Sequence, residues 1–185
     1  CCHVSSSSHH RTNLGGGFLA FMLLATLFLL GMASCDPVTG TGPGAPPDPK
    51  SYIHVDPGTG TAVVTLIAGH PATDIQFNFD GYGNGALVLV VPAGWQVTIQ
   101  CVNHGTVPNS CAVVADGKAT EPVQPSWSTS DPHRGLDPGQ SASFVFTPTA
   151  KGTYRIASLV DGSEASGMWA DLEVGGGGVP TLTAH

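Results

Sequence analysis

The chain has 185 residues, with 6 Lys or Arg against 13 Asp or Glu, and a formal net charge of -7. This acidic excess argues against nucleic acid or anionic lipid as an electrostatic partner. The length allows one domain with a substantial core beside shorter flanking segments.

An unbroken apolar run, FLAFMLLATLFLLGM, occupies residues 18–32 and follows the basic residue Arg11. It is shorter than the roughly 20 apolar residues of a membrane-spanning helix and has the layout of a secretory signal. Its end, Met32-Ala33-Ser34-Cys35, resembles the lipobox of bacterial lipoprotein signal peptides. We therefore expect residues 1–34 to be a lipoprotein-type signal peptide and Cys35 to be acylated. An ordinary signal peptide or an N-terminal anchor helix is the alternative.

Two segments flank the expected domain. Residues 35–60 are dense in Pro, Gly, Thr and Asp and poor in large apolar side chains. Such a composition buries too little surface to offset its ordering entropy, which predicts a tether. Residues 175–185, GGGGVPTLTAH, are interpreted as a flexible tail.

Between these segments, over residues 61–174, apolar side chains recur with a period of two rather than 3.6. Short β-branched and aromatic runs separated by Gly- and Pro-rich turns are typical of an antiparallel sandwich or a Greek-key barrel. The fold class is therefore all-β. A long Pro- and Ser-rich stretch, 116–141, predicts a functional loop or a locally packed excursion. The expected strands are 62–68, 74–79, 86–91, 95–102, 111–115, 142–147, 152–158 and 168–174.

Two cysteines, Cys101 and Cys111, lie within the expected domain. An exported chain meets an oxidising compartment, so these two are candidates for a disulfide. Two buried free thiols are the alternative, because the distance between the Cα atoms does not follow from the sequence.

Three stretches carry a family resemblance: FNFDGYGNG at 77–85, VPAGW at 91–95, and GTYRIAS with GMW at 152–158 and 167–169. Together they resemble the sulfocyanins, a branch of the blue copper proteins with the cupredoxin fold. The resemblance covers roughly residues 60–174. It implies a cupredoxin-like Greek-key β-sandwich or barrel and, for an intact family member, electron transfer by copper.

The resemblance also implies four copper ligands: a His in a Pro-His-Ser stretch, then a Cys, a His and a Met spaced by four residues each. The corresponding residues here are Asn109, Ser158, Ser163 and Met168, and the family's loop proline corresponds to Asp161. A type 1 site needs a thiolate and two imidazoles, with a thioether as a weak axial ligand. Three of the four ligands are replaced, so we expect a degenerate site that holds no metal.

A substitute metal site is conceivable from His104, Cys111 and Met168, because Cys111 follows Asn109 by two residues and would point the same way along a strand. It would require the backbone to rearrange. Met168 is otherwise interpreted as a core residue.

No catalytic motif stands out. The chain lacks G-x-S-x-G, H-E-x-x-H, a P-loop and a paired C-x-x-C. Ser130, Asp131 and His133 are close in sequence, but a triad is defined by geometry, and His133 is more simply a solvated surface residue. We therefore expect that the protein is not an enzyme.

Three functions remain open from the sequence. The first is a lipid-anchored domain without copper, serving as an interaction or structural module at the outer face of the cytoplasmic membrane, with membrane redox or copper-handling proteins as partners. The second is a copper electron carrier with atypical ligands. The third is a lipoprotein that binds a small ligand at the vacated position. The replaced ligands favour the first, in which no cofactor is expected.

Overall fold

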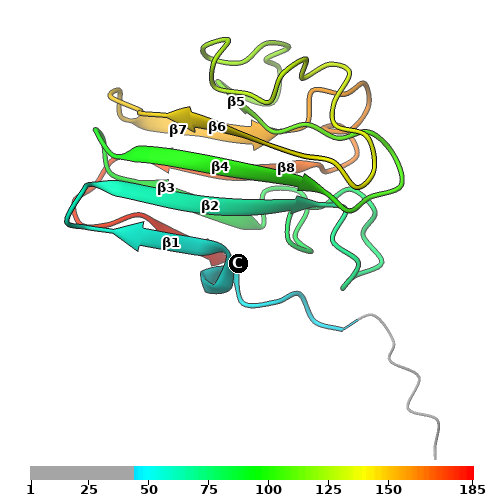
Figure 1. The fold of residues 1–185 in the computed structure, drawn as a ribbon, viewed down its shortest axis with the longest axis horizontal. Helices are drawn as coiled ribbons and strands as arrows, with labels where there is room; N and C mark the ends of the chain where they lie inside the picture. The colour runs from blue at the N-terminus through cyan, green and yellow to red at the C-terminus, as the bar shows by residue number, and fades with distance from the viewer. Residues whose placement is uncertain (1–43) are drawn as a thin grey trace, which may run out of the picture. The chain divides into compact units, whose positions relative to one another are not determined.

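The computed structural model describes residues 44–185 and places almost all regular structure in two β-sheets (Figure 1). A 3-10 helix, η1 (Pro49–Tyr52), precedes the strands. The first sheet has the order β1 (Ile53–Asp56), β2 (Thr61–Ala68), β4 (Gln96–Asn103) and β6 (Ser141–Phe146). The second has the order β5 (Ala112–Val114), β7 (Gly152–Ala157), β8 (Trp169–Val174), β3 (Leu87–Val91) and β9 (Thr181–Ala184).

The expected all-β sandwich is confirmed, but not all of its strands are antiparallel, because two of the strand pairs are parallel. β2 runs parallel to β4, and β3 runs parallel to β8. β3 lies between β2 and β4 in the chain but belongs to the other sheet, so the chain crosses the sandwich twice between these two neighbours. Such crossings bring strands side by side in the same direction, which hairpin connections cannot do.

The core lies between the two sheets and follows from the period of two. Along β2, every second residue is buried, from Ala62 to Ala68, and β4 repeats the pattern from Val97 to Asn103. These side chains pack against apolar residues of β3, β7 and β8 in one cluster. Full burial of a Val, Leu or Ile side chain contributes about 1.5 to 3 kcal/mol, so this cluster holds the sheets together.

The C-terminal segment is not a flexible tail, which corrects the expectation for residues 175–185. β9 pairs antiparallel with β3, and Leu182 is 1% exposed. The glycines before it take positive φ angles, including Gly176 at 72° and Gly178 at 104°, which only glycine adopts readily. These glycines allow the chain to turn back before β9, whereas the composition of the segment predicted a flexible tail.

The expected tether also ends earlier than residue 60. η1 and β1 belong to the domain, and Tyr52 and Ile53 pack against its core. Asp48 accepts a hydrogen bond from Lys50 N (3.0 Å) and so caps η1. Residues 1–43, with the expected signal peptide and Cys35, lie outside the described residues. Within residues 44–185, no helix has the length and apolarity needed to cross a bilayer.

Residues 74–79 form a turn-rich loop rather than the expected strand. Only Phe79 pairs there, through isolated bridges to Ala68 and Tyr82. The Asn78 side chain instead organises the loop: its Oδ1 accepts hydrogen bonds from His70 N (3.0 Å) and Gly81 N (2.7 Å). An internal side-chain bond of this kind competes with ladder formation.

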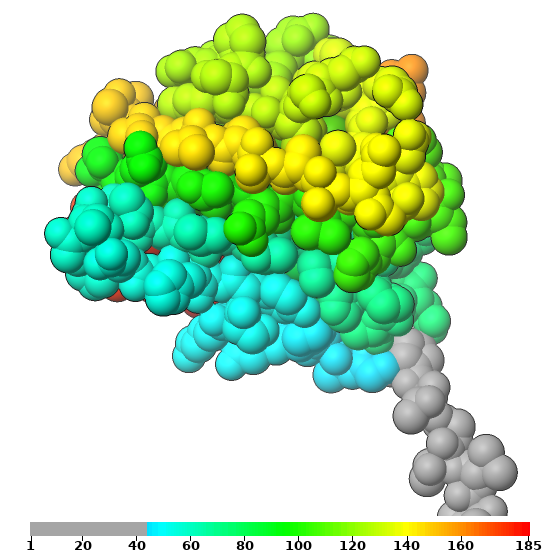
Figure 2. All heavy atoms as spheres, viewed as in Figure 1, coloured from blue at the N-terminus to red at the C-terminus, as the bar shows by residue number. Residues whose placement is uncertain are grey.

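The long connection between β5 and β6 is a locally packed excursion, one of the two expected possibilities. It packs over one side of the sandwich and forms much of the surface in that view (Figures 1 and 2). Trp127 anchors it against Phe146, with the ring centroids 5.5 Å apart. Isolated bridges join Asn109 to Leu136 and Ala112 to Ser128.

A disulfide joins Cys101 of β4 to Cys111, the residue before β5, with a Cα–Cα distance of 6.0 Å and an S–S length of 2.02 Å. β4 and β5 belong to different sheets, so the bond links the two layers of the sandwich. Both cysteines are fully buried in the core.

Removing this bond should destabilise the domain measurably. The cysteines are 10 residues apart, and closing a loop of that size corresponds to about 3 kcal/mol in the chain-entropy treatment. We expect the variant Cys101→Ala/Cys111→Ala to lose about that much free energy of unfolding in a denaturant titration. The wild-type chain with its disulfide reduced serves as the control and should lose a similar amount. A loss below about 1 kcal/mol in both would contradict the expectation.

Candidate functional site

The four positions that correspond to copper ligands are all buried. Asn109 precedes β5, Ser158 directly follows β7, and Met168 directly precedes β8, with Ser163 in the loop between them. Their exposed fractions are 2% for Asn109, 1% for Ser158, 2% for Ser163 and 0% for Met168. Gly135, in the connection between β5 and β6, lies close to both segments, because a Cβ on it would be 3.0 Å from the Asn109 backbone and 2.7 Å from Val160 Cγ2.

Backbone hydrogen bonds close the 158–168 loop. Ser158 N donates to Met168 O (3.1 Å), and Met168 N donates to Ser163 O (3.0 Å). The flanking strands β7 and β8 are paired up to Ala157 and Trp169, so the loop starts and ends on a fixed frame. Its shape therefore does not depend on a bound ion to connect these residues.

Two serine hydroxyls join this loop to the neighbouring one by a reciprocal exchange. Ser110 N donates to Ser158 Oγ (3.1 Å), and Leu159 N donates to Ser110 Oγ (2.9 Å). Both bonds are buried, where an unpaired backbone N–H is costly. Each serine hydroxyl thus satisfies a buried backbone N–H of the other segment, although Ser110 and Ser158 are 48 positions apart in the sequence.

Replacing Ser110 by Ala should test this exchange. The variant leaves the buried Leu159 N–H without an acceptor, and we expect a loss of about 1 to 3 kcal/mol of unfolding free energy. The matched control is Ser166→Ala, because the Ser166 hydroxyl donates to Gly162 O (2.8 Å) in the same loop but is exposed. Denaturant titrations should show at most about 0.5 kcal/mol for the control. Equal losses in both variants would contradict the role of the exchange.

Asn109 belongs to an amide network. Its Nδ2 donates to Val107 O (3.1 Å) and to Asn103 Oδ1 (3.3 Å), whereas Asn109 Oδ1 has no hydrogen-bond partner among the described residues. Asn103 Oδ1 also accepts from Gly105 N (2.9 Å). The network is neutral throughout.

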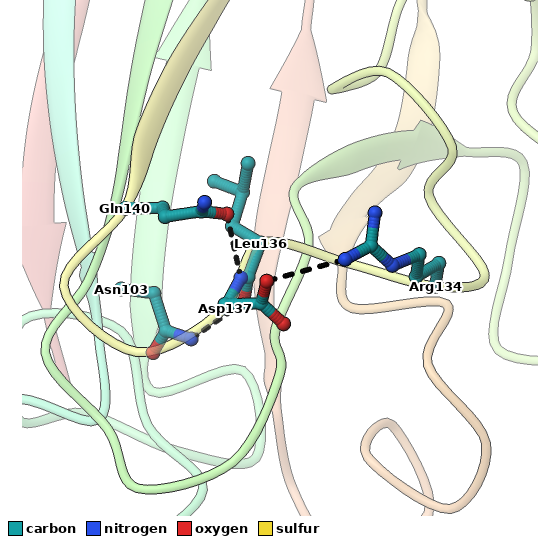
Figure 3. Close-up of polar contacts among 5 residues, drawn as sticks. All are labelled: Asn103, Arg134, Leu136, Asp137 and Gln140. Atoms are coloured by element: carbon teal, nitrogen blue, oxygen red, sulfur yellow. Dashed lines mark hydrogen bonds and ion pairs between the residues drawn. The ribbon is translucent and has the colours of Figure 1, made fainter.

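Figure 3 shows how the Asn103 side chain reaches the segment that pairs with Asn109. Asn103 Nδ2 donates to Leu136 O (2.8 Å), and Leu136 N donates to Asn109 O (2.8 Å). The next turn is closed by Asp137 N, which donates to Gln140 Oε1 (3.0 Å). On its exposed side Arg134 Nη2 lies 3.2 Å from Asp137 Oδ2. Asn109 is thus held by its backbone pairing with Leu136 and by its side-chain bond to Asn103.

The donor set does not fit a type 1 copper centre. An amide, two hydroxyls and one thioether stand at the four positions, and a hydroxyl stays protonated near neutral pH. Soft thiolate and imidazole donors are what such a centre requires. Within residues 44–185, no group of three or more His, Cys, Asp or Glu side chains is arranged to hold a metal ion.

The other sequence candidates are not brought together. Cys111 is bonded to Cys101, so it has no thiolate to offer beside His104 and Met168. His133 has a half-exposed side chain whose Nε2 lies 3.4 Å from Glu121 Oε1, which fits a solvated surface residue.

One cluster beside the loop was not expected from the sequence. The Arg155 guanidinium carbon lies 3.5 Å from the centroid of the Trp169 ring, and Arg155 Nη1 lies 2.9 Å from Glu164 Oε1. A surface pocket of about 450 Å³ adjoins it, with Ser158 and Asp161 among the lining residues. Arg155 and Glu164 are 9 positions apart and form no recognisable motif, so only the folded loop reveals the pair.

Comparisons with known proteins agree with this architecture. Residues 49–181 match the family model described as the Sulfocyanin (SoxE) domain. A sulfocyanin from Sulfolobus acidocaldarius is 30% identical over 125 residues, which cover 60% of this chain and 62% of that protein. The chain therefore spans less than two thirds of that relative's length.

Solved structures of rusticyanin variants are similar in fold. One crystal structure aligns with a TM-score of 0.51 and 22% identity over 68% of this chain and 87% of that one. A second variant aligns with the same TM-score and identity over 68% and 88%. At this level of identity the likeness establishes the cupredoxin fold alone.

Proposed function

Because the chain belongs to the sulfocyanin family of cupredoxins, we propose that its domain has lost the type 1 copper site and acts as an interaction or structural module. The observation that carries this proposal is the replacement of three ligands, at Asn109, Ser158 and Ser163, by side chains that cannot supply a thiolate or an imidazole.

The contacts of the replaced residues support the proposal. Ser158 Oγ already accepts a backbone hydrogen bond, and Asn109 Nδ2 is shared between two acceptors. An ion there would meet the Ser158 hydroxyl and the unpaired amide oxygen of Asn109, and such neutral oxygen donors are a poor match for copper. The loop keeps the family's frame without the family's electron-transfer chemistry.

The domain works outside the cytoplasm in this proposal, held at the outer face of the cytoplasmic membrane by a lipid on Cys35. The apolar run before Cys35 supports export, and the Cys101–Cys111 disulfide fits an oxidising compartment. Membrane redox or copper-handling proteins are the partners that fit this location. Fatty-acid labelling of the full chain, which should vanish in Cys35→Ala, tests the anchor.

Copper analysis of the purified full chain tests the central point. After incubation with Cu(II), and separately with Cu(I), then removal of loosely held ions, we expect far less than one copper per chain and no intense visible absorption. Stoichiometric copper that survives the removal step, with an absorption band of thiolate–Cu(II) type, would overturn the proposal in favour of an electron carrier with atypical ligands.

A second candidate function is the binding of a small ligand beside the former copper position. The pocket of about 450 Å³ that Ser158 lines favours it, since ligand sites commonly have volumes of about 300 to 1,000 Å³. A thermal-shift screen of the full chain against small molecules separates this candidate from a purely structural module. A compound that raises the melting temperature, and fails to do so after Asp161→Asn, would favour ligand binding.

A further inference from the structure

Asp80 is a fully buried carboxylic acid at the turn that follows Phe79. Its backbone N–H donates to Ile67 O (3.0 Å), and its Oδ1 accepts a hydrogen bond from Ile67 N (2.8 Å). Its φ is 55°, a left-handed conformation that Asp tolerates better than most residues. The two bonds to Ile67 fasten this turn to the end of β2.

The other carboxyl oxygen, Asp80 Oδ2, has no hydrogen-bond partner among the described residues. Burial raises the pKa of Asp80 to about 7, and the hydrogen bond from Ile67 N only partly opposes this. A buried carboxylate without a cation is far more costly than the neutral acid. The turn in its observed form therefore suits a protonated Asp80.

The groups around Asp80 do not offer it a cation. Tyr52 of η1 and Tyr82 of the same turn face it, and its negative charge adds to the burial that raises the pKa of both phenols. Asp48 acts on Tyr82 in the same direction. His70 lies beyond Tyr52, and burial followed by the charge of His104 lowers its pKa, so it is neutral near pH 7.

The same turn holds the segment that leads into the domain. Tyr82 Oη donates to Pro47 O (3.0 Å), and a Cβ on Gly81 would lie 3.1 Å from Pro46 Cβ. A second attachment joins η1, because Tyr52 Oη lies 3.2 Å from His70 Nε2. Residues 46 and 47 thus rest on the turn that Asp80 fastens to β2, whereas Tyr52 is held separately, at His70.

We propose that Asp80 is the pH-sensitive element of a clasp, formed by the 79–82 turn, which fastens residues 46 and 47 to the sandwich. When the Asp80 carboxyl loses its proton to solvent, the clasp releases these residues and loosens the adjoining η1. The ionised side chain moves toward water, the two bonds to Ile67 break, and Gly81 and Tyr82 lose their hold on Pro46 and Pro47. Release would lengthen the connection between the domain and Cys35. That consequence rests on the proposed anchoring, whereas the clasp itself does not.

Limited trypsin digestion of the full chain tests the clasp, because Lys50 lies in η1 and Lys118 lies in a distant loop. The ratio of cleavage after Lys50 to cleavage after Lys118, measured in the same digest, cancels the pH dependence of the protease. Cleavage follows the population of the open form. Linkage predicts that this ratio rises about 20-fold from pH 5.5 to 7.5 and then levels off.

Two variants make the outcome decisive. Asp80→Asn should keep the ratio constant within about twofold over the same range. Tyr82→Phe, which lacks only the hydroxyl that reaches Pro47, should raise the ratio several-fold at pH 5.5 and keep its pH dependence. The clasp is overturned by a wild-type ratio that does not change with pH, by the same rise in Asp80→Asn, or by an unchanged ratio in Tyr82→Phe. None of these measurements depends on copper.

Discussion

The triple variant Asn109→His, Ser158→Cys and Ser163→His is expected to bind one copper ion per chain and to show the intense visible absorption of a thiolate–Cu(II) bond. The wild-type chain should do neither. The substitutions restore the thiolate and both imidazoles, and Met168 already supplies the axial thioether.

The frame for this site exists in the wild-type structure. The loop is closed by bonds from Ser158 N to Met168 O and from Met168 N to Ser163 O, which involve backbone atoms only. A sulfur at position 158 can still accept the hydrogen bond from Ser110 N, because a thiolate is also an acceptor. The change is therefore one of donor chemistry rather than of fold.

Two controls isolate the donor set. Ser158→Cys alone introduces the thiol without the imidazoles and should bind copper more weakly than the triple variant. Ser166→Cys places a thiol on the exposed side of the same loop and reports any exchange with the Cys101–Cys111 disulfide. If the triple variant folds and still binds no copper, the assignment of these positions to the family's ligands is wrong.

Strand positions could be predicted because burial on one face imposes a period of two. The alternation in β2 and β4 is regular, and the expected strands 62–68 and 95–102 each lie within one residue of the observed ones. Strand direction could not be predicted, since parallel and antiparallel ladders place side chains in the same alternation. β9 was not predicted because Leu182 is its one buried residue, and a single apolar residue does not change the polar, Gly-rich composition of the segment.

At the candidate site, the family resemblance proposes the four ligand positions, but the sequence does not predict what surrounds them. Ser158 is held by Ser110, which is distant in sequence. Asn109 is held by the backbone of the distant Leu136 and by the side chain of Asn103. No local pattern encodes such contacts. The burial of Asp80 could not be predicted either, because an Asp next to Gly in a turn is expected to be exposed. The structure shows that Asp80 is buried and bonded to Ile67.

The free energy of unfolding is expected to fall by as much as about 4 kcal/mol between pH 4 and pH 8, because of Asp80. Its pKa is about 7 in the folded chain against a model value of 3.8. Each pH unit between these values lowers the stability by about 1.4 kcal/mol, because the unfolded chain releases a proton that the folded chain keeps. Well below the lower value, and again above about pH 8, Asp80 adds no slope.

Other groups act in the opposite direction, so the wild-type curve alone does not isolate Asp80. Burial lowers the pKa of His70 below its usual 6.5, which makes stability rise with pH up to about that value. The pKa of the exposed Asp56 is also lowered, chiefly by a hydrogen bond from the Thr59 hydroxyl. A group with a lowered pKa loses its contribution as the pH falls, whereas Asp80 loses its contribution as the pH rises.

Denaturant titrations of Asp80→Asn and of the wild type from pH 4 to 8 separate these effects. The difference in unfolding free energy between them should shift in favour of the variant as the pH rises, by up to about 4 kcal/mol, and level off near pH 8. Asp74→Asn, which removes an exposed carboxyl in the same loop, should follow the wild type throughout. Because opening of the clasp lets Asp80 ionise without global unfolding, a shift smaller than 4 kcal/mol measures the free energy of that opening. A pH-independent difference would mean that Asp80 is already ionised in the folded chain.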